Sequence, residues 1–557
     1  MSNTNHSLTR GSIAAKAAAL LTAAALGLTG FALTGGNAAS AAETTPTAAT
    51  AAQSQEDTPF DYYAGIPNLP SDHVFENITL ERLEDILRYG KGNFVILIGG
   101  TWDSATTAAL PAINTAVKAQ GIEKIYNFDP HLDNAGADTL VNINDKNNAV
   151  DAFAKTAFLK LNGGLGTSMG LDCAKSLLPV RRHKAKQMRF IDIILGQVET
   201  ARNRLGVELP LTFMNSFRTS ADTMKVLNRD KRFHQDDIPM EIIQHVEPKI
   251  DLSTGEPVSF PSNPDLEWCP PGHGDLYSTL WESGLLDILE SHGFKYLFIS
   301  NSDNLGARPS RTLAQHFENT DAPFMIEVSK RTEADRKGGH IVRDKVTGRL
   351  MLREMTQVAP EDAAEAKNID KHPYFNTNNI WVRIDSLREK LAQSNGVLPL
   401  PVIRNYKTVD PTDASTTEVI QLETAMGAAV SLLNGAICVE VDRMRFLPVK
   451  TTDDLFIMRS DRFHLTDQYE MEDGNYIFPN VQLDTRFYKN IHDFDDRFPY
   501  GVPSLAAAAS VTVEGDWTFG RDVNFYGEAT LHDEGRPSYV PNGEFVGPQG
   551  IEPDEWL

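Results

Sequence analysis

The spacing of apolar residues predicts a small β-α-β unit early in the globular part of the chain. Residues 79–87 place Leu and Ile at helical spacing, which predicts a short helix. The apolar run Phe94–Ile98 predicts a buried strand, Ala105–Gln120 predicts a helix and Lys124–Phe128 predicts a second strand. These elements together indicate a small α/β segment over residues 58–150.

A longer alternation of strands and helices begins at about residue 153. Four apolar runs predict strands, at Phe158–Leu161, Leu211–Met214, Tyr296–Ile299 and Phe324–Val328. The helical segments between them favour an α/β domain with a mostly parallel sheet, over residues 151–460. Loops at the carboxyl ends of such strands are where ligands bind, so polar residues that follow these runs are candidates for a functional site.

The last part of the chain, residues 461–557, has a different pattern of apolar residues and glycines. Residues 511–520 and 523–531 read as short strands broken by glycine at near-regular spacing. This spacing suits two or three coils of a small parallel β-helix, although an ordinary β-meander would give the same pattern.

The first 57 residues look like a targeting segment and a linker. Arg10 and Lys16 precede the apolar run 17–33, and the small residues Ala39 and Ala41 follow it, as in a secretory signal peptide over residues 1–42. Residues 43–57 read as a flexible linker. The apolar run is too short to predict a membrane span, and no other segment approaches that length, so we expect no stable span in the mature chain.

Composition narrows the classes of function. The 557 residues suggest two to four domains, and 41% of them are hydrophobic, which is enough for sizeable cores. A net charge of −23 argues against a general nucleic-acid-binding protein. Three cysteines without CxxC spacing, Cys173, Cys269 and Cys438, make a disulfide framework or a zinc site unexpected.

A glycine-rich loop follows the first strand of the main domain. The sequence Leu161-Asn-Gly-Gly-Leu-Gly-Thr-Ser-Met-Gly170 is followed by Lys175. Glycines let the backbone approach a ligand, and their N–H groups can surround phosphate oxygens ahead of a predicted helix N-terminus. No GK[ST] closes the loop, so it is not a Walker A motif. A tight turn that binds nothing remains an alternative for the loop taken alone.

Eight sequence blocks in a fixed order carry a resemblance to a known family. They are KLNGGLGTSMG (160–170), MNSFRTSADT (214–223), WCPPGHGDLY (268–277), FISNSDNLGA (298–307), ADRKGGH (334–340), FNTNNIWV (375–382), QLETAMGAA (421–429) and RFLPVKTTDDL (445–455). Over residues 153–535 the chain resembles the eukaryotic-type UDP-glucose pyrophosphorylases, that is, the UTP–glucose-1-phosphate uridylyltransferases. The resemblance implies a Rossmann-like, GT-A-type mixed sheet flanked by helices. It also implies transfer of uridylyl from UTP to glucose 1-phosphate with the help of Mg²⁺.

The resemblance also assigns roles to individual residues. Displacement at a phosphate needs positioning and charge neutralisation, so Lys175 and Lys450 are the expected catalytic residues. Lys450 follows the apolar run FLPV, so we expect it to be buried. Asp303, at a strand end, is the expected Mg²⁺ ligand. The nucleotide-binding set is Leu161, Asn162, Gly163, Gly164, Lys175, Gln235, Gly272, Asp303 and Lys450. The sugar-phosphate set is Gly164, His273, Asn301, Ser302, Asp303, Gly338, Glu354, Asn376 and Asn378.

Two parts of the chain depart from the family pattern. Residues 171–174, which include the acidic Asp172, stand where the family has Gly-Pro before the loop lysine. Residues 80–130 resemble the start of a thioredoxin-like domain, but Asp103 and Thr106 occupy its cysteine positions, so thiol chemistry is excluded there.

The cellular compartment and the exact substrate stay open. UTP and glucose 1-phosphate are cytoplasmic, whereas a signal-like peptide implies export. A catalytically weak or exported nucleotide-sugar-binding protein is one alternative, and a uridylyltransferase for another sugar 1-phosphate is a second. The oligomeric state is not predicted, and coils that relatives use for assembly would be missing if the β-helix stops at Leu557.

Overall fold

The computed structural model describes most of residues 63–128 and residues 152–551. Within the second range it leaves out residues 167–168, 172, 184–185, 236, 333–334, 336–337, 412 and 474–478. The signal-like peptide 1–42, the linker 43–57 and Asp172 therefore lie outside the described residues. In the part that is described, no helix is both long enough and apolar enough to cross a membrane. The chain divides into two compact units, residues 1–146 and residues 147–557.

The first unit contains a small parallel sheet. Strands β1 (Phe75–Ile78), β3 (Ile125–Phe128) and β2 (Ile96–Ile98) pair in that order, and α3 (Ser104–Lys118) connects β2 to β3. The predicted β-α-β unit is confirmed. The predicted burial of the first strand is wrong, because β2 is an edge strand and Ile98 is 53% exposed.

The predicted helix at 79–87 is described only at two positions. Leu83 and Ile86 are helical and buried, and they pack with Ile78 and Phe128. Thr106 and Pro111 both lie in α3, whereas Trp102 and Asp103 fall outside the described residues. The likeness to the start of a thioredoxin-like domain therefore stays a prediction.

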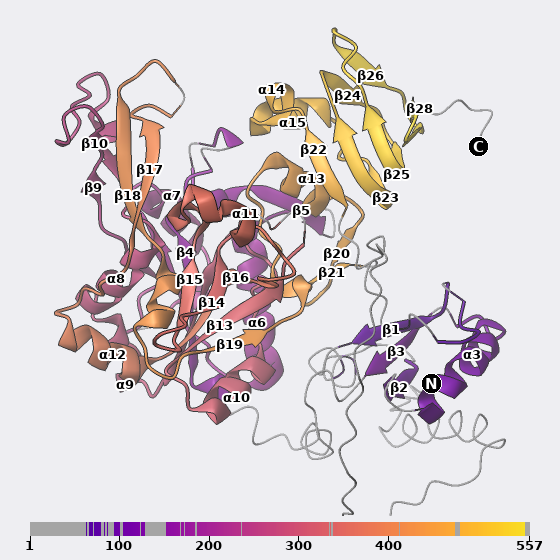
Figure 1. Ribbon diagram of the computed structural model, residues 1–557, viewed down its shortest axis with the longest axis horizontal. Coiled ribbons are helices and arrows are strands. Elements are labelled where there is room, and N and C mark those ends of the chain that lie inside the picture. The colour runs from indigo at the N-terminus through magenta and orange to yellow at the C-terminus, as the bar shows by residue number, and fades with distance from the viewer. Residues whose placement is uncertain are drawn as a thin grey trace, which may run out of the picture. The chain divides into compact units, whose positions relative to one another are not determined.

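The second unit is built on a nine-stranded mixed sheet (Figure 1). Strands β15, β14, β16, β12, β4, β7 and β8 follow one another across it, and β13 joins β16 to β19. The pairs formed by β12, β4, β7 and β8 are parallel, whereas β16 runs antiparallel to β12 and β13. All four predicted strands occur in this sheet. Their bounds and those of their partners are β4 Thr156–Asn162, β7 Leu211–Asn215, β8 Glu241–Ile243, β12 Tyr296–Asn301, β13 Phe324–Lys330, β14 His340–Arg343, β15 Leu350–Arg353, β16 Tyr374–Arg383 and β19 Ile437–Glu440.

Helices cover both faces of this sheet. Successive residues of a strand point to opposite sides, so each face carries apolar side chains that pack against helices. On β4, Phe158 belongs to one hydrophobic cluster, and Leu159 and Leu161 belong to the other. The first cluster includes residues of α6 (Phe190–Leu205) and α10 (Arg311–Thr320). The second includes residues of α8 (Leu276–Glu282), α9 (Leu285–Ser291) and α12 (Ile384–Gln393).

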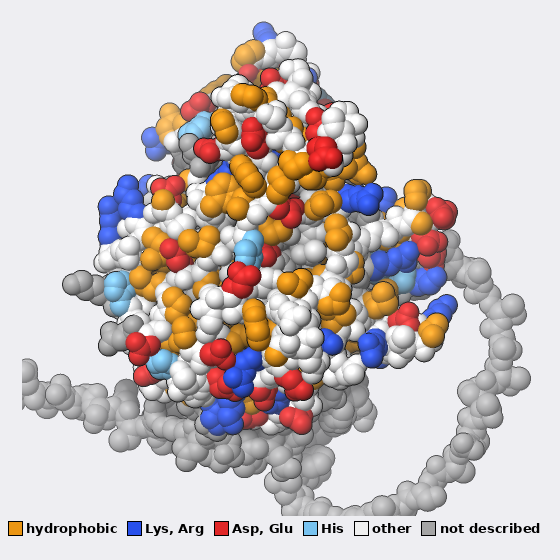
Figure 2. All heavy atoms as spheres, turned by 90° about the vertical axis from the view of Figure 1, so that its left-hand side faces the viewer, with side chains coloured by type: hydrophobic (Ala, Val, Ile, Leu, Met, Phe, Trp, Pro, Cys, Tyr) orange, Lys and Arg blue, Asp and Glu red, His pale blue; other side chains and the backbone are white. Residues whose placement is uncertain are grey.

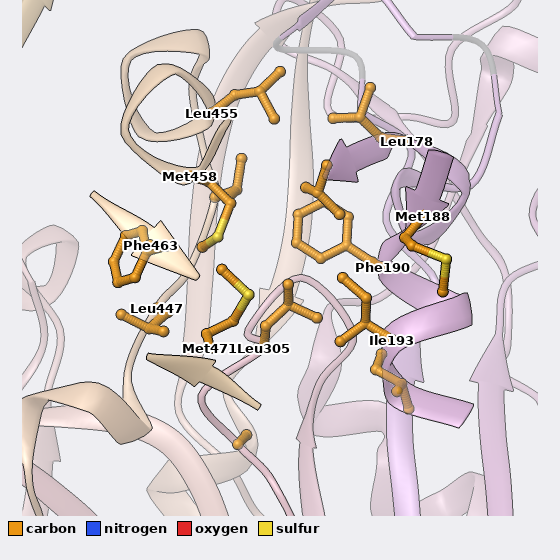
Figure 3. Packing of buried hydrophobic residues seen from close by; sticks show 14 of the residues in the cluster. Leu178, Met188, Phe190, Ile193, Leu305, Leu447, Leu455, Met458, Phe463 and Met471 are labelled. Atoms are coloured by element: carbon orange, nitrogen blue, oxygen red, sulfur yellow. The ribbon is translucent and has the colours of Figure 1, made fainter. Parts of the chain in front are cut away.

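The first cluster continues into the C-terminal part of the chain. Figure 3 shows Phe190 and Ile193 of α6 facing Leu455 and Met458 of α13 (Thr452–Arg459). The same cluster reaches Val546 near the end of the described residues. The predicted regions 151–460 and 461–557 therefore share one core.

The C-terminal strands stack as a β-helix rather than a meander. Strands β22, β23, β25 and β27 pair in parallel, as do β24 and β26, whereas a meander would pair them antiparallel. Trp517 is opposite Ser538, and Asn524 is opposite Phe545. In these two pairings the partners are 21 positions apart in the sequence. The bounds are β22 Asn480–Leu483, β23 Ser504–Val513, β24 Trp517–Phe519, β25 Asn524–Leu531, β26 Ser538–Val540, β27 Phe545–Gly547 and the antiparallel β28 Gly550–Ile551.

Smaller elements surround the sheet. A three-stranded antiparallel extension consists of β10 (Ile250–Asp251), β18 (Glu418–Thr424) and β17 (Val402–Thr408), beside the pair β9 (Glu247–Pro248) and β11 (Trp268–Cys269). Figure 2 shows that charges of both signs are interspersed with hydrophobic side chains on the face it displays. The remaining short elements are β5 Pro179–His183, β6 Lys186–Arg189, α7 Ser220–Leu227, α11 Ala363–Ala366, β20 Phe463–Leu465, β21 Met471–Asp473, α14 Thr485–Tyr488 and α15 Ile491–Arg497.

Candidate functional site

The glycine loop leaves the carboxyl end of β4 and folds back on itself. Leu165 forms an isolated bridge with Ala174, and the backbone N–H of Lys175 donates to the carbonyl of Gly164 at 3.4 Å. A β-carbon on Gly166 would clash with the side chain of Leu171. Glycine is therefore needed there for the loop to close, and closure carries Lys175 back beside the start of the loop.

The loop does not lead into an α-helix, so the predicted helix N-terminus is wrong. Lys175 begins a 3₁₀ turn of only three residues, Lys175–Leu177. Pro179 explains this, because the residue before a proline avoids helical geometry and Leu178 is extended. The attraction for phosphate must therefore come mainly from Lys175 and from the loop N–H groups.

Lys175 and Asp303 form an ion pair between the glycine loop and the end of β12. Lys175 Nζ lies 2.9 Å from Asp303 Oδ2, and the two side chains are only 13% and 20% exposed. Asp303 stands in the turn that follows β12, as predicted. The pair brings a cation and a carboxylate together where β4 and β12 end side by side.

Lys450 is held next to the same turn by backbone contacts. Asn304 and Pro448 form a bridge, and the N–H of Val449 donates to the carbonyl of Asp303 at 3.2 Å. The predicted burial of Lys450 is wrong, because it is exposed while Leu447 and Val449 are buried. Alternate residues of an extended segment point in opposite directions, so the apolar run reaches the core without carrying the lysine there.

The positive charge of Lys450 affects the pKa values of two further predicted residues, His273 and Glu354. Desolvation, and secondarily the positive charge of Lys450, lowers the pKa of His273 to about 4. Burial raises the pKa of Glu354, and Lys450 opposes that rise. Since electrostatic effects of this kind act over short distances, Lys450, His273 and Glu354 belong to one group of side chains.

The tautomer of His273 follows from its backbone partner. The N–H of Met426 donates to His273 Nδ1 at 3.0 Å, so that nitrogen carries the lone pair. With its low pKa the ring is neutral near pH 7, and Nε2 then bears the proton. Gly272, which has φ +80°, packs so tightly on the end of β18 that a β-carbon would lie 2.8 Å from the carbonyl oxygen of Thr424. This packing fixes the turn that presents Nε2 as a hydrogen-bond donor.

Four of the nine predicted sugar-phosphate residues, Gly338, Glu354, Asn376 and Asn378, lie on or beside β14, β15 and β16. Asn376 Nδ2 donates to Asn378 Oδ1 at 2.7 Å, and the N–H of Asn376 donates to the carbonyl of Gly339 at 3.0 Å. A β-carbon on Gly339 would lie 2.5 Å from Glu354 Oε2. Gly338, next in the chain, donates its N–H to the carbonyl of Asp335 at 2.9 Å. These contacts bring together two amides and one half-buried carboxylate, which are suited to sugar hydroxyls.

Asn162 and Ser302 hold the strand ends together with their side chains. Asn162 Nδ2 donates to Asn215 Oδ1 at 2.8 Å and to Thr223 Oγ1 at 2.9 Å, and its Oδ1 accepts a hydrogen bond from Ser302 Oγ at 2.9 Å. Both side chains are buried. The backbone is part of the same network, because the N–H of Ser302 donates to the carbonyl of Leu161, whose side chain is also buried. Asn301 ends β12 opposite Leu161 and is only half-buried.

Gln235 lies in the segment that precedes β8. It lines a cavity of about 590 Å³ together with His234, Asp237, Ile238, Pro239, Met240, Ser283 and Ile288. None of these belongs to the predicted site.

Gln244 lies beside the glycine loop and was not among the residues that the sequence analysis singled out. It directly follows β8, and its N–H donates to the carbonyl of Asn215 at the end of β7 at 2.8 Å. Its side chain is 6% exposed and lies against Gly163 of the glycine loop. The available signal was the apolar pair Ile242-Ile243 followed by a glutamine, but a three-residue strand is too short to stand out from a loop.

Asp303 is the one predicted metal ligand. Across the residues that the structure describes, no three His, Cys, Asp or Glu side chains are grouped as a metal site. This donor set still fits Mg²⁺, which commonly takes one or two carboxylates and completes its shell with substrate phosphates and water. The neighbouring Lys175 would favour the same phosphates.

The sequence model of the UTP–glucose-1-phosphate uridylyltransferase family matches residues 115–526. The chain belongs to this family. It is 36% identical to the Saccharomyces cerevisiae UTP–glucose-1-phosphate uridylyltransferase over 407 residues, covering 71% of this chain and 78% of that one. It is 33% identical to a Dictyostelium discoideum enzyme of the same name over 491 residues, covering 85% and 92%.

Solved structures support the same family and confirm the mixed α/β nucleotidyltransferase fold. The UDP-glucose phosphorylase of Trypanosoma brucei is 40% identical, with a TM-score of 0.66, and the match covers 71% of this chain and 86% of that chain. A Leishmania major UDP-glucose pyrophosphorylase variant in complex with UDP-glucose is 39% identical, with the same TM-score, covering 72% and 86%.

The similarity to the family begins closer to the N-terminus than the sequence blocks indicated. The family match begins at residue 115, inside α3, and not near residue 153 as the sequence blocks indicated. The Dictyostelium match covers 85% of the chain, which is more than the second compact unit contains. Part of the first unit therefore also has a counterpart in a relative.

Proposed function

We propose that this protein transfers the uridylyl group of UTP to glucose 1-phosphate, giving UDP-glucose and pyrophosphate by in-line displacement at the α-phosphate. The observation that carries the proposal is the joining of Lys175, Asp303 and Lys450. Lys175 pairs with Asp303 at 2.9 Å, and Val449 binds the backbone of Asp303 immediately before Lys450. Two segments that carry lysines from distant parts of the chain thus meet at the turn that holds Asp303, at the carboxyl edge of the sheet.

The two lysines supply charge to a reaction between polyanions. When UTP binds, a phosphate oxygen replaces the Asp303 carboxylate as the partner of Lys175. Lys450 stabilises the charge on the reacting phosphates as the pyrophosphate leaves. Because the side chains of Lys175 and Asp303 are largely shielded from solvent, the charge of Lys175 interacts more strongly there than it would in bulk water.

Asp303, once released by Lys175, would hold Mg²⁺ together with phosphate oxygens of the substrate. A bound Mg²⁺ draws charge from the α-phosphate. The remaining contacts to the phosphates come from the chain's own residues. His273 Nε2 donates a hydrogen bond to a phosphate oxygen, and the N–H groups of Gly163 and Gly164 surround the nucleotide phosphates.

The base and the sugar are recognised at opposite ends of the site. We assign the uracil contact to Gln244 rather than Gln235, because Gln244 lies against the glycine loop. An amide offers both a donor and an acceptor, as the uracil edge requires. Glu354, Asn376 and Asn378 bind the sugar hydroxyls.

The test is pyrophosphate release from UTP and Mg²⁺ with each of three acceptors, namely glucose, galactose and N-acetylglucosamine 1-phosphate. We expect release to be strongest with glucose 1-phosphate. If no acceptor gives pyrophosphate release, the proposed transfer is wrong and a protein that only binds nucleotide sugars is the alternative. If another acceptor is preferred, the assigned sugar is wrong.

We place the activity in the cytoplasm, where UTP and glucose 1-phosphate occur. The signal-like residues 1–42 argue for export instead. N-terminal sequencing of the mature protein distinguishes the two, because an exported protein would lose these residues.

A further inference from the structure

A histidine beside Gln244 links two segments of the site that are far apart in the sequence. His245 Nδ1 lies 2.8 Å from Asp275 Oδ1, and the backbone N–H of His245 donates to Asp275 Oδ2 at 2.7 Å. His245 Nε2 lies 2.8 Å from Glu282 Oε2. Asp275 ends the GHGD turn that contains Gly272 and His273, and Glu282 is the last residue of α8.

Both ring nitrogens of His245 face carboxylates, which has a consequence for its charge. A neutral imidazole has one N–H donor, so its other nitrogen would direct a lone pair at a carboxylate. Only the imidazolium donates to both partners. The bond to Glu282, together with that to Asp275, accordingly raises the pKa of His245 above its ordinary value, against the opposing effect of burial.

We propose that His245, in its imidazolium form, is a positioning residue that holds the two UTP-binding segments of the site together. One segment carries Gln244, and the other carries Gly272 and His273. The inference rests on the proposed function, because it takes UTP as the ligand. His245 does not touch the reacting atoms in this arrangement, so it acts on UTP affinity and not on the chemical step.

The charged groups around the ring determine how the link responds to pH. Asp275 and Glu282 act directly on His245, and Asp275 also contributes, after burial, to the raised pKa of Glu247, two residues further along the chain. Since the pKa of His245 in the folded protein is raised, the link is complete below about pH 6.5, the value for an unperturbed histidine. It is lost as the pH rises through the higher folded-state value.

The experiment measures kcat and the KM for UTP from pH 6 to pH 9 at saturating glucose 1-phosphate. For His245→Gln, we expect the KM at pH 6.5 to rise by about tenfold to a hundredfold with little change in kcat, the size of a lost charged hydrogen bond. For His245→Arg, whose charge is permanent, we expect a low KM that no longer rises with the pH step seen in the wild type.

A second variant tests the link without touching the histidine. Glu282 is 66% exposed, so Glu282→Gln should fold normally. It removes the largest cause of the raised pKa, so the pH at which KM rises should move downward. His292→Gln is the matched control, because His292 is a partly exposed histidine that faces one carboxylate, Asp237, at 3.8 Å and is not among the predicted site residues.

Two results would overturn the role of His245. One is a wild-type KM profile in both His245→Gln and Glu282→Gln, and the other is a loss confined to kcat. These failures differ from a failure of the proposed function, in which the wild-type protein itself releases no pyrophosphate from UTP and glucose 1-phosphate.

Discussion

Gln244 and Gly163 lie so close that a β-carbon on the glycine would be 2.5 Å from the glutamine Nε2. The contact joins the residue after β8 to the loop after β4 across the intervening β7. It places an amide beside the glycine loop, where the proposed function puts the base of UTP.

We expect Gln244→Ala to lower kcat/KM for UTP by about tenfold to a hundredfold, since a site built to hydrogen-bond its ligand loses discrimination with the bond. Activity with CTP, whose base edge differs, should fall less. Gln235→Ala is the matched control and should leave both substrates unaffected. The reverse pattern, with Gln235 sensitive and Gln244 silent, would restore the assignment made from sequence.

Lys450 should be required for the chemical step but not for folding. We expect Lys450→Ala to lower kcat by about a hundredfold to a thousandfold, the range for one charge-stabilising group in an active site. Its melting temperature should be unchanged, because the side chain is exposed. Lys345→Ala, at the exposed tip of the β14–β15 hairpin, is the control. Normal turnover in Lys450→Ala would remove this lysine from the mechanism.

Asp303→Asn should separate metal binding from the rest of the site. Asparagine keeps the shape but loses the charge, so we expect a higher Mg²⁺ concentration for half-maximal rate as well as a lower kcat. Mg²⁺ titration of initial rates measures both. Asp321→Asn is the control, because Asp321 is exposed and its left-handed conformation tolerates asparagine. An unchanged Mg²⁺ requirement in Asp303→Asn would contradict the assigned ligand.

A buried ion pair anchors the segment that carries Lys450. Arg445 donates to both oxygens of Glu327 at 2.8 Å, and Glu327 also accepts from Trp381 Nε1 at 2.9 Å. Glu327 is 0% and Arg445 4% exposed. Glu327→Gln leaves the guanidinium buried without its counter-charge, so we expect a loss of about 3–5 kcal/mol in the free energy of unfolding.

Urea unfolding measures that loss. Glu440→Gln is the matched control, because Glu440 is half exposed and faces Lys330 at 3.6 Å. A surface pair of this kind contributes about 0–1 kcal/mol. Equal effects of the two substitutions would show that the buried pair does not anchor the segment.

The fold was predictable where apolar runs were long. β4, β7, β12 and β13 were each predicted because they are buried on both faces, which gives continuous apolar sequence. β8 was missed because it has only three residues. Because β8 was missed, Gln244 was missed as well: a residue is recognised at a strand end only when the strand itself is recognised.

The sequence indicates candidate site residues but not their surroundings. Sequence blocks identified Lys175, Asp303 and Lys450, yet no pattern could show that Lys175 pairs with Asp303. That contact depends on the parallel pairing of β4 and β12, which are more than 130 positions apart. The exposure of Lys450 was mispredicted because hydrophobic neighbours in an extended segment do not determine the direction of the next side chain.

Asp453 should make the stability of the second unit depend on pH. It lies in the first turn of α13, and burial, with the nearby charge of Asp454, raises its pKa to about 6. The folded state therefore binds the proton more tightly than the unfolded state, so stability falls as the pH rises from about 4 to about 6. Asp453→Asn keeps an acceptor for the N–H of Leu483 and should remove about 1–3 kcal/mol of that fall. Urea unfolding at pH 4, 5, 6 and 7 measures the slope, and Asp493→Asn, an exposed first-turn position in α15, is the control. An identical slope in Asp453→Asn and the wild type would show that Asp453 is already charged at pH 4.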